Sequence, residues 1–110
     1  MNSLEQQLLQ QEVGDAEPRL QVCTGTKVDA GKWWRKVPVW LCVMADELVL
    51  VAVGRRRLFE RIPFADCPDA AYNHASGELV IAPPEGRQLN RVKLPPSEAL
   101  KILELLNSQN

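Results

Sequence analysis

The chain has 110 residues, which suits one folded domain better than two, because small domains bury too little surface to offset their chain entropy. No stretch reaches the ~20 apolar residues of a membrane-spanning helix, so an integral membrane protein is excluded. A net charge of -1 argues against the strongly basic balance of a dedicated nucleic-acid binder. The 45% hydrophobic and 25% charged residues are typical of a globular domain.

Two further features predict a cytoplasmic protein. The N-terminal segment has no basic stretch followed by an apolar run, so no secretion signal is expected. Cys23, Cys42 and Cys67 are odd in number and far apart, which favours free thiols in a reducing compartment over a disulfide framework. We expect all three sulfurs to be core atoms.

Residues 1–17 are predicted to form a short helix and a linker. Ser3 and Gln6 have the spacing of a capping box, and Gly14 is placed to end the helix. The apolar surface between Leu4 and Val13 is thin, so the helix is marginal on its own. We expect it to pack on the rest of the chain, to join a partner, or to fray.

From Leu20 to Leu94 the pattern changes to Val-rich runs at roughly ten-residue spacing, which is typical of strands. Short, turn-like connections imply antiparallel neighbours. The segment Pro63–Asp69 does not look like a short turn. Its two prolines indicate a corner where the chain leaves one sheet for another. The seven predicted strands are Leu20–Val28, Lys36–Met44, Leu48–Val53, Leu58–Ile62, Ala70–His74, Glu78–Ala82 and Gln88–Leu94.

The second and third predicted strands are unusual because Val39–Met44 and Leu48–Val53 are apolar at almost every position. Both faces of this hairpin should therefore be buried. The cover of its outer face is the N-terminal helix, the C-terminal helix or a second copy of the protein. In contrast, Leu58–Ile62 and the last strand are predicted to face water on one side, with Glu60 and Lys93 among their solvent-facing residues.

The last segment is predicted to be an amphipathic helix. Pro95 and Pro96 stop the preceding strand, and Ser97 is the expected N-cap. The apolar residues between Ala99 and Leu106 form a face wide enough to close a core. The predicted domain comprises residues 18–110.

This order of elements resembles that of pleckstrin-homology-like domains of the bacterial type. Val39–Val51 is similar to their second and third strands, and Arg57–Asp66 to their fourth strand and the turn after it. The rest of the pleckstrin-homology-like pattern is matched by Gly77–Ile81 and by the passage from Leu94 into the final helix. The resemblance covers Leu20–Asn107 and implies a mainly β fold. That fold is a seven-stranded antiparallel barrel of two near-orthogonal sheets, capped by a C-terminal α-helix, to which this chain adds a short N-terminal helix.

Positive charge is concentrated between Lys27 and Arg61, a segment that contains eight basic and four acidic residues. In an up-and-down run of strands, the first and third connections lie at the same end of the sheet. The basic segments in these connections should therefore lie together and form a cationic rim. Its members are Lys27, Lys32, Trp33, Trp34, Arg35, Lys36, Arg55, Arg56 and Arg57.

The basic residues of such a rim are able to bind phosphates or acidic side chains, and its tryptophans are able to anchor at a bilayer or protein interface. The resemblance implies a phosphoinositide headgroup site in the same loop, with Lys27 as its early lysine. The match is broken at Trp33, which stands where those domains place a basic residue. The alternative is that Trp33 or Trp34 packs inward while the arginines decorate a solvated turn.

Residue types for catalysis or metal binding are sparse. Cys67, His74 and a carboxylate from Asp66 or Asp69 form the one trio of suitable types, and ordinary loop and strand-end positions explain them better. No pair of Cys or His residues has zinc-site spacing. We expect no enzyme activity, no cofactor and no metal.

The favoured hypothesis is a non-enzymatic binding or scaffolding module that engages a protein partner or itself. Its basis is the apolar hairpin that needs a cover and the first helix that is able to dock on a neighbour. The alternative is reversible binding to anionic lipid headgroups through the cationic rim. Single-stranded nucleic acid ranks last, because Trp40 and Tyr72 alone are placed on strands for base stacking.

Overall fold

A computed structural model describes residues 3–29, 36–54 and 57–107. Its helices are α1 (Ser3–Val13) and α2 (Pro96–Asn107), and a 3-10 helix, η1 (Phe64–Asp66), separates two groups of strands. The first group is β1 (Leu20–Asp29), β2 (Lys36–Val43), β3 (Glu47–Val53) and β4 (Arg57–Pro63). The second group is β5 (Ala71–Asn73), β6 (Glu78–Val80) and β7 (Arg91–Lys93).

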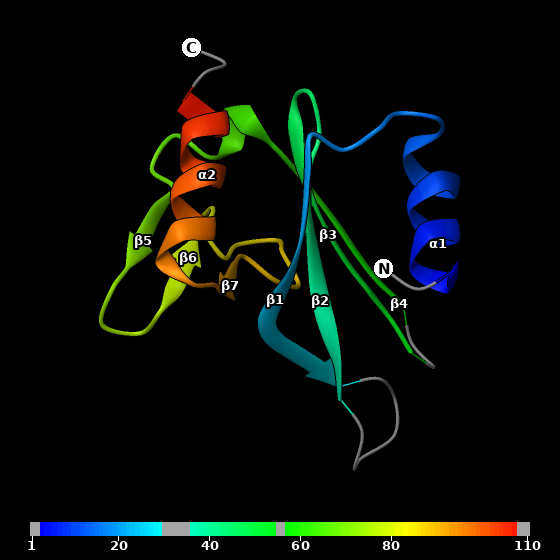
Figure 1. Ribbon diagram of the computed structural model, residues 1–110, viewed down its shortest axis with the longest axis horizontal. Helices are drawn as coiled ribbons and strands as arrows, with labels where there is room; N and C mark the ends of the chain where they lie inside the picture. Colours follow the sequence, from blue (N-terminus) through cyan, green and yellow to red (C-terminus); the bar gives the residue numbers. More distant parts are fainter. Residues whose placement is uncertain (1–2, 30–35, 55–56, 108–110) are drawn as a thin grey trace.

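These strands form two antiparallel sheets, in the orders β1-β2-β3-β4 and β5-β6-β7 (Figure 1). The mainly β class, the seven strands and the change of sheet after the fourth strand are therefore confirmed. The last three strands are shorter than predicted, at three residues each. Around them the chain forms loop contacts instead, such as the hydrogen bond that the Asn90 side chain donates to the Ala82 carbonyl (2.8 Å). Pairing of the described strands does not by itself close the sheets into the predicted barrel.

The two sheets meet where β1 bends. The register of β1 with β2 shifts between Cys23 and Lys27, which marks a β-bulge. Beyond the bulge, the Thr26 hydroxyl oxygen accepts a hydrogen bond from the backbone N–H of Lys93 in β7 (2.8 Å). Gly25 permits this approach, because a Cβ at that position would lie 3.3 Å from the Lys93 Cβ. The bend thus brings the edge of β1 against the edge of β7.

The main core lies between the two sheets and α2. Side chains that are fully buried there include Leu41, Leu50, Leu79 and Val92. α2 buries its inward face against the same core through Ala99, Ile102 and Leu106. The predicted role of the last helix as a cap on the core is therefore confirmed.

The predicted start of this helix is wrong by two positions. The Pro95 carbonyl accepts a hydrogen bond from the Ala99 N–H (3.1 Å), so Pro95, not Ser97, occupies the N-cap position. Pro96 becomes the first helical residue, where a missing N–H leaves no hydrogen bond unmade.

α1 covers the outer face of the β2–β3 hairpin. Leu8 and Leu9 are buried against this face, in a second apolar cluster that also contains Cys42, Met44, Val49 and Val51. Both faces of the hairpin are buried as predicted, and of the three possible covers the structure contains the N-terminal helix. Figure 1 shows α1 and α2 on opposite sides of the four-stranded sheet.

Candidate functional site

Three members of the predicted cationic rim are described, and all are exposed: Lys27, Lys36 and Arg57. The other members, Lys32, Trp33, Trp34, Arg35, Arg55 and Arg56, lie outside the described residues. The register supports the topology behind the prediction. Because Trp40 of β2 pairs with Val51 of β3, the β1–β2 and β3–β4 connections leave the sheet at the same end.

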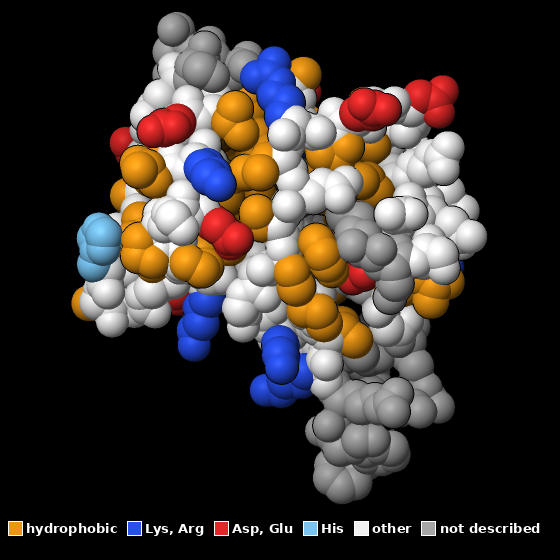
Figure 2. All heavy atoms as spheres, in the orientation of Figure 1, with side chains coloured by type: hydrophobic (Ala, Val, Ile, Leu, Met, Phe, Trp, Pro, Cys, Tyr) orange, Lys and Arg blue, Asp and Glu red, His pale blue; other side chains and the backbone are white. Residues whose placement is uncertain are grey.

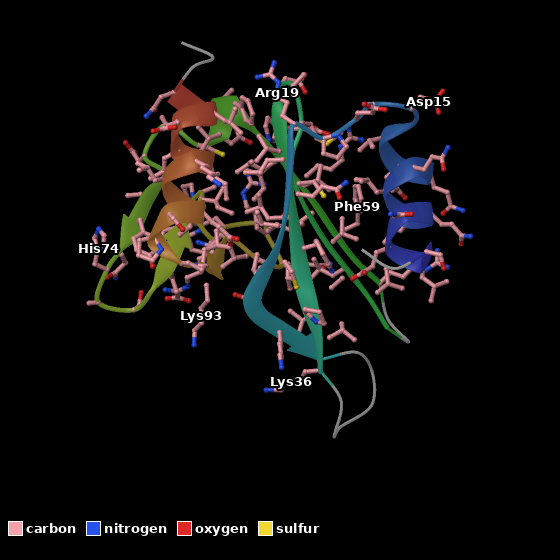
Figure 3. All side chains as sticks on the ribbon, in the orientation of Figure 1. Asp15, Arg19, Lys36, Phe59, His74 and Lys93 are labelled. Atoms are coloured by element: carbon pink, nitrogen blue, oxygen red, sulfur yellow. The ribbon has the colours of Figure 1, made fainter. Side chains whose placement is uncertain are left out.

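Lys93 adds a cation at this end that sequence reasoning did not place there. Its N–H is bonded to Thr26, the neighbour of Lys27 in β1, and its side chain is exposed. Figure 3 shows Lys36 and Lys93 at the same end of the molecule, and Figure 2 shows basic side chains gathered there. The contact between β1 and β7 produces this grouping. The one feature of the sequence that indicated an exposed Lys93 was the alternation of basic and apolar residues in the last strand.

The opposite border of the four-stranded sheet is open. β4 is the last strand in that sheet, and its outer edge pairs with no described strand. The Phe64 N–H donates to the Asp46 carbonyl (3.0 Å), which fixes the alternation of hydrogen-bonded pairs between β3 and β4. By this alternation, the β4 residues that point their backbone groups at β3 are Leu58, Glu60 and Ile62.

Phe59 and Arg61 therefore direct their backbone N–H and C=O groups away from the sheet. No backbone hydrogen bond between described residues uses these groups at the outer edge. The Phe59 ring lies on the side of the sheet that α1 covers (Figure 3). The Arg61 guanidinium is bound to the Glu47 carboxylate (2.8 Å), which raises the pKa of Arg61, and it also donates to the Glu12 carbonyl of α1 (3.3 Å).

On its inner side, the β4 edge carries a small charge cluster. Glu60 lies on the same face as Leu58 and Ile62, because residues two apart in a strand share a face. The prediction that Glu60 faces water is therefore wrong. Its side chain is 14% exposed, and its carboxylate lies 3.7 Å from the Arg87 guanidinium, which also binds the Asp66 carboxylate (2.9 Å). Arg87 thereby ties β4 to η1 and to the β6–β7 loop.

A groove of about 600 Å³ lies beside this cluster, between residues 65–69 and residues 80–90. Its shape depends on the turn from Pro84 to Arg87, in which the Arg87 N–H donates to the Pro84 carbonyl (3.1 Å). Gly86 has a φ of 74°, a conformation that favours glycine at this turn position. The groove was not predicted from the sequence, because η1 and the β6–β7 loop are brought together only by the folding of the two sheets.

The charge of this groove is mostly negative. Asp66, Asp69 and Glu85 line it together with Arg87. Arg87 is shared between Asp66 and Glu60, and none of the ion pairs among the described residues involves Asp69 or Glu85. The lining therefore keeps an excess of carboxylates over bases beside an apolar floor that includes Ile81 and Ala82.

The cysteine and histidine side chains lie in separate environments. Cys67 is buried, and its Sγ donates to the Pro63 carbonyl (3.4 Å). Burial raises the pKa of Cys67; Arg87 opposes this shift and Asp66 adds to it, so the reactive thiolate is disfavoured. The His74 ring packs edge-on against the Tyr72 ring, with centroids 4.8 Å apart.

The other two cysteines differ from each other. Cys42 lies under α1, and burial raises its pKa to about 12. Cys23 is exposed, so the prediction that all three sulfurs belong to the core is wrong. The reason is its place on β1, an outer strand of the sheet next to the bulge, where no described helix covers it.

Within residues 3–29, 36–54 and 57–107, no three His, Cys, Asp or Glu side chains are grouped so that they can hold a metal ion. The helices in these ranges are too short or too polar to cross a membrane. No family model matches the chain, and comparisons with curated proteins and with solved structures return no match. The resemblance to pleckstrin-homology-like domains therefore stays a prediction.

Proposed function

We propose that this protein is a non-enzymatic binding module of pleckstrin-homology-like architecture that engages a partner protein or a second copy of itself. The observation that carries the proposal is the open β4 edge, where Phe59 and Arg61 present backbone donors and acceptors that pair with no strand in the described part of the chain. The apolar β2–β3 hairpin does not support the proposal, because α1 already covers its outer face.

An open edge of this kind accepts an extended segment of another chain as an additional strand. In this mode, hydrogen bonds to the main chain provide affinity, and alternate side chains of the added segment provide specificity. β4 spans seven residues, which is within the usual length of a strand and long enough for such a ladder. The groove beside Arg87 gives the side chains of the added segment a place to bind.

Arg61→Pro and Arg61→Ala test this proposal as a matched pair. Both remove the contacts of the Arg61 side chain, but the proline alone removes the outward N–H, and proline is tolerated on a strand edge. Size-exclusion chromatography with light scattering and capture from a native extract are carried out for both variants. We expect partners or dimers of the wild type to persist with Arg61→Ala and to be lost with Arg61→Pro. Equal behaviour of the two variants contradicts strand addition.

Reversible binding to anionic lipid headgroups is the second candidate. The observation that favours it is the gathering of Lys27, Lys36 and Lys93 from three strands at the end of the sheet that carries the β1–β2 connection. Arg57, the first residue of β4, lies at the same end. Each basic residue near an anionic surface contributes about 1 kcal/mol, which salt reduces.

Vesicle sedimentation tests the second candidate. Lipid binding requires more protein to sediment with phosphatidylserine vesicles than with phosphatidylcholine vesicles, and less at high salt. It also requires Lys27→Glu with Lys36→Glu to reduce sedimentation, whereas Lys101→Glu on α2 serves as the control. Equal amounts of protein on both kinds of vesicle at low salt exclude this function.

A further inference from the structure

The inner side of the open β4 edge carries information about what binds there. Glu60 points inward from the middle of β4, and Asp66 and Asp69 lie on the adjoining groove. The base described in this region is Arg87, whose guanidinium is already shared by Glu60 and Asp66. A strand added to β4 therefore meets uncompensated negative charge on its inner side.

The geometry of strand addition determines which residues of the ligand meet this charge. Side chains alternate between the two faces of a sheet, so those opposite Leu58, Glu60 and Ile62 turn to the inner side, where Glu60 contacts Arg87 at the edge of the groove. Those opposite Phe59 turn to the outer side, where the partly exposed Phe59 ring offers an apolar contact. The matching segment carries basic residues at every second position and apolar residues between them.

A second copy of this chain is a poor match for the same surface. Full-length antiparallel pairing of β4 with another β4 places Glu60 directly opposite Glu60 of the other copy. It also places Pro63, which has no N–H, at a position that requires a donor. Like charges directly opposite each other in a sheet are destabilising. The charge of the edge thus favours a different chain over self-pairing.

We infer that β4 binds an extended, basic segment of a partner protein, in which Lys or Arg residues alternate with apolar residues and face the groove of Asp66, Asp69 and Glu85. This inference rests on the proposed strand addition and specifies its ligand. The exposed carboxylates of Asp69 and Glu85 select the partner's charge, and the backbone of Phe59 and Arg61 holds it.

The test uses two peptides of one length, acetyl-Thr-Lys-Val-Lys-Val-Lys-Thr-amide and the same peptide with Glu in place of Lys. Each is titrated at low salt into the full-length, isotope-labelled protein, and the amide signals of Phe59 and Arg61 are followed by NMR. We expect the Lys peptide to bind ~10-fold more tightly than the Glu peptide, as two or three weakly screened ion pairs provide. Similar affinities, or preference for the Glu peptide, overturn the inference.

Two variants locate the selectivity. Asp69→Asn with Glu85→Gln is expected to reduce the ~10-fold preference to less than ~3-fold. Asp15→Asn with Glu17→Gln, which neutralises the same number of exposed carboxylates in the linker after α1, is expected to preserve it. A preference unchanged by the groove variant contradicts the inference.

Arg61→Pro separates this inference from the proposal on which it rests. If the proline variant binds neither peptide while Arg61→Ala binds both equally, strand addition stands and the basic ligand is wrong. If Arg61→Pro binds the Lys peptide as tightly as Arg61→Ala does, both are wrong. A concentration-dependent dimer that Arg61→Pro abolishes identifies a second copy as the occupant and overturns the inference alone.

Discussion

The two outer strands of the four-stranded sheet end in different ways. At one border, β1 bends at a bulge, uses Gly25 to approach β7 and receives a hydrogen bond from Lys93 through the Thr26 hydroxyl. At the other border, β4 keeps the backbone groups of Phe59 and Arg61 without a described strand partner. The first border is joined to the second sheet, whereas the second has no described strand beyond it.

The open border also carries features that limit indiscriminate pairing. Glu60 is an inward-pointing charge on an outer strand, and Pro63 removes a donor at the end of β4. Both are devices that discourage edge-to-edge aggregation. Unlike β1, which is joined to β7, β4 therefore limits edge-to-edge pairing through an inward charge and a proline.

The largest expected effect comes from breaking the core that holds the two sheets together. Ile102→Ala removes a fully buried side chain of α2 and should lower the free energy of unfolding by about 2–5 kcal/mol. The matched control is Leu100→Ala, because Leu100 is 57% exposed on the same helix. It should change stability by less than about 0.5 kcal/mol. Urea denaturation measures both, and equal effects contradict the position of α2.

Gly25→Val breaks the closed border directly. The new side chain must displace Lys93, whose Cβ lies 3.3 Å from the added Cβ, and we expect a loss of about 1–3 kcal/mol. Arg57→Val introduces the same residue at the exposed start of β4 and should cost less than about 0.5 kcal/mol. Thermal unfolding compares the two variants. If valine is tolerated equally at both borders, the closure of β1 on β7 is wrong.

The apolar face between the two borders is tested by pH. Burial raises the pKa of Cys42 from 9.0 to about 12, so between these values the unfolded chain loses the thiol proton while the folded chain keeps it. Folding stability must therefore fall with rising pH in this window, by about 1.4 kcal/mol per pH unit from this group, and be unaffected by it below pH 9.

The contribution of Cys42 is isolated by difference. Urea denaturation of the wild type and of Cys42→Ala, followed from pH 8 to the alkaline limit of folding, should show a steeper decline for the wild type above the ordinary thiol pKa. Parallel pH profiles for the two proteins contradict the burial of this thiol under α1.

Thr26→Val has the smallest expected effect. It removes the acceptor for the Lys93 N–H and should cost about 1 kcal/mol, whereas Thr26→Ser keeps the hydroxyl and should cost less. A valine variant as stable as the serine variant shows that the hydrogen bond between Thr26 and Lys93 does not stabilise the contact of β1 with β7.

Much of this fold was predictable from local patterns. Valine-rich runs predicted the strands, and the two prolines of Pro63–Asp69 predicted the corner between the sheets. The continuous apolar runs of the hairpin predicted burial on both of its faces. The identity of the cover was not predictable, because the thin apolar face of α1 is equally able to meet another molecule. The start of α2 was misassigned, because a serine after two prolines is a plausible cap on propensity alone.

The candidate site was less accessible to sequence reasoning. Glu60 was misplaced because its charge was given more weight than its two-residue spacing from Leu58 and Ile62, which puts all three on one face. The Arg87 groove joins segments far apart in the chain, and no local pattern encodes that contact. Most of the cationic rim lies outside the described residues, so that prediction stays untested.

Amide hydrogen exchange along β4, measured residue by residue by NMR in the free protein, tests the open edge most directly. The account predicts alternation, with the amides of Phe59 and Arg61 exchanging at least ~100-fold faster than those of Glu60 and Ile62, which bond to β3. Uniform protection from Phe59 to Ile62 would show that the outer edge is already occupied or covered, and would contradict strand addition at β4.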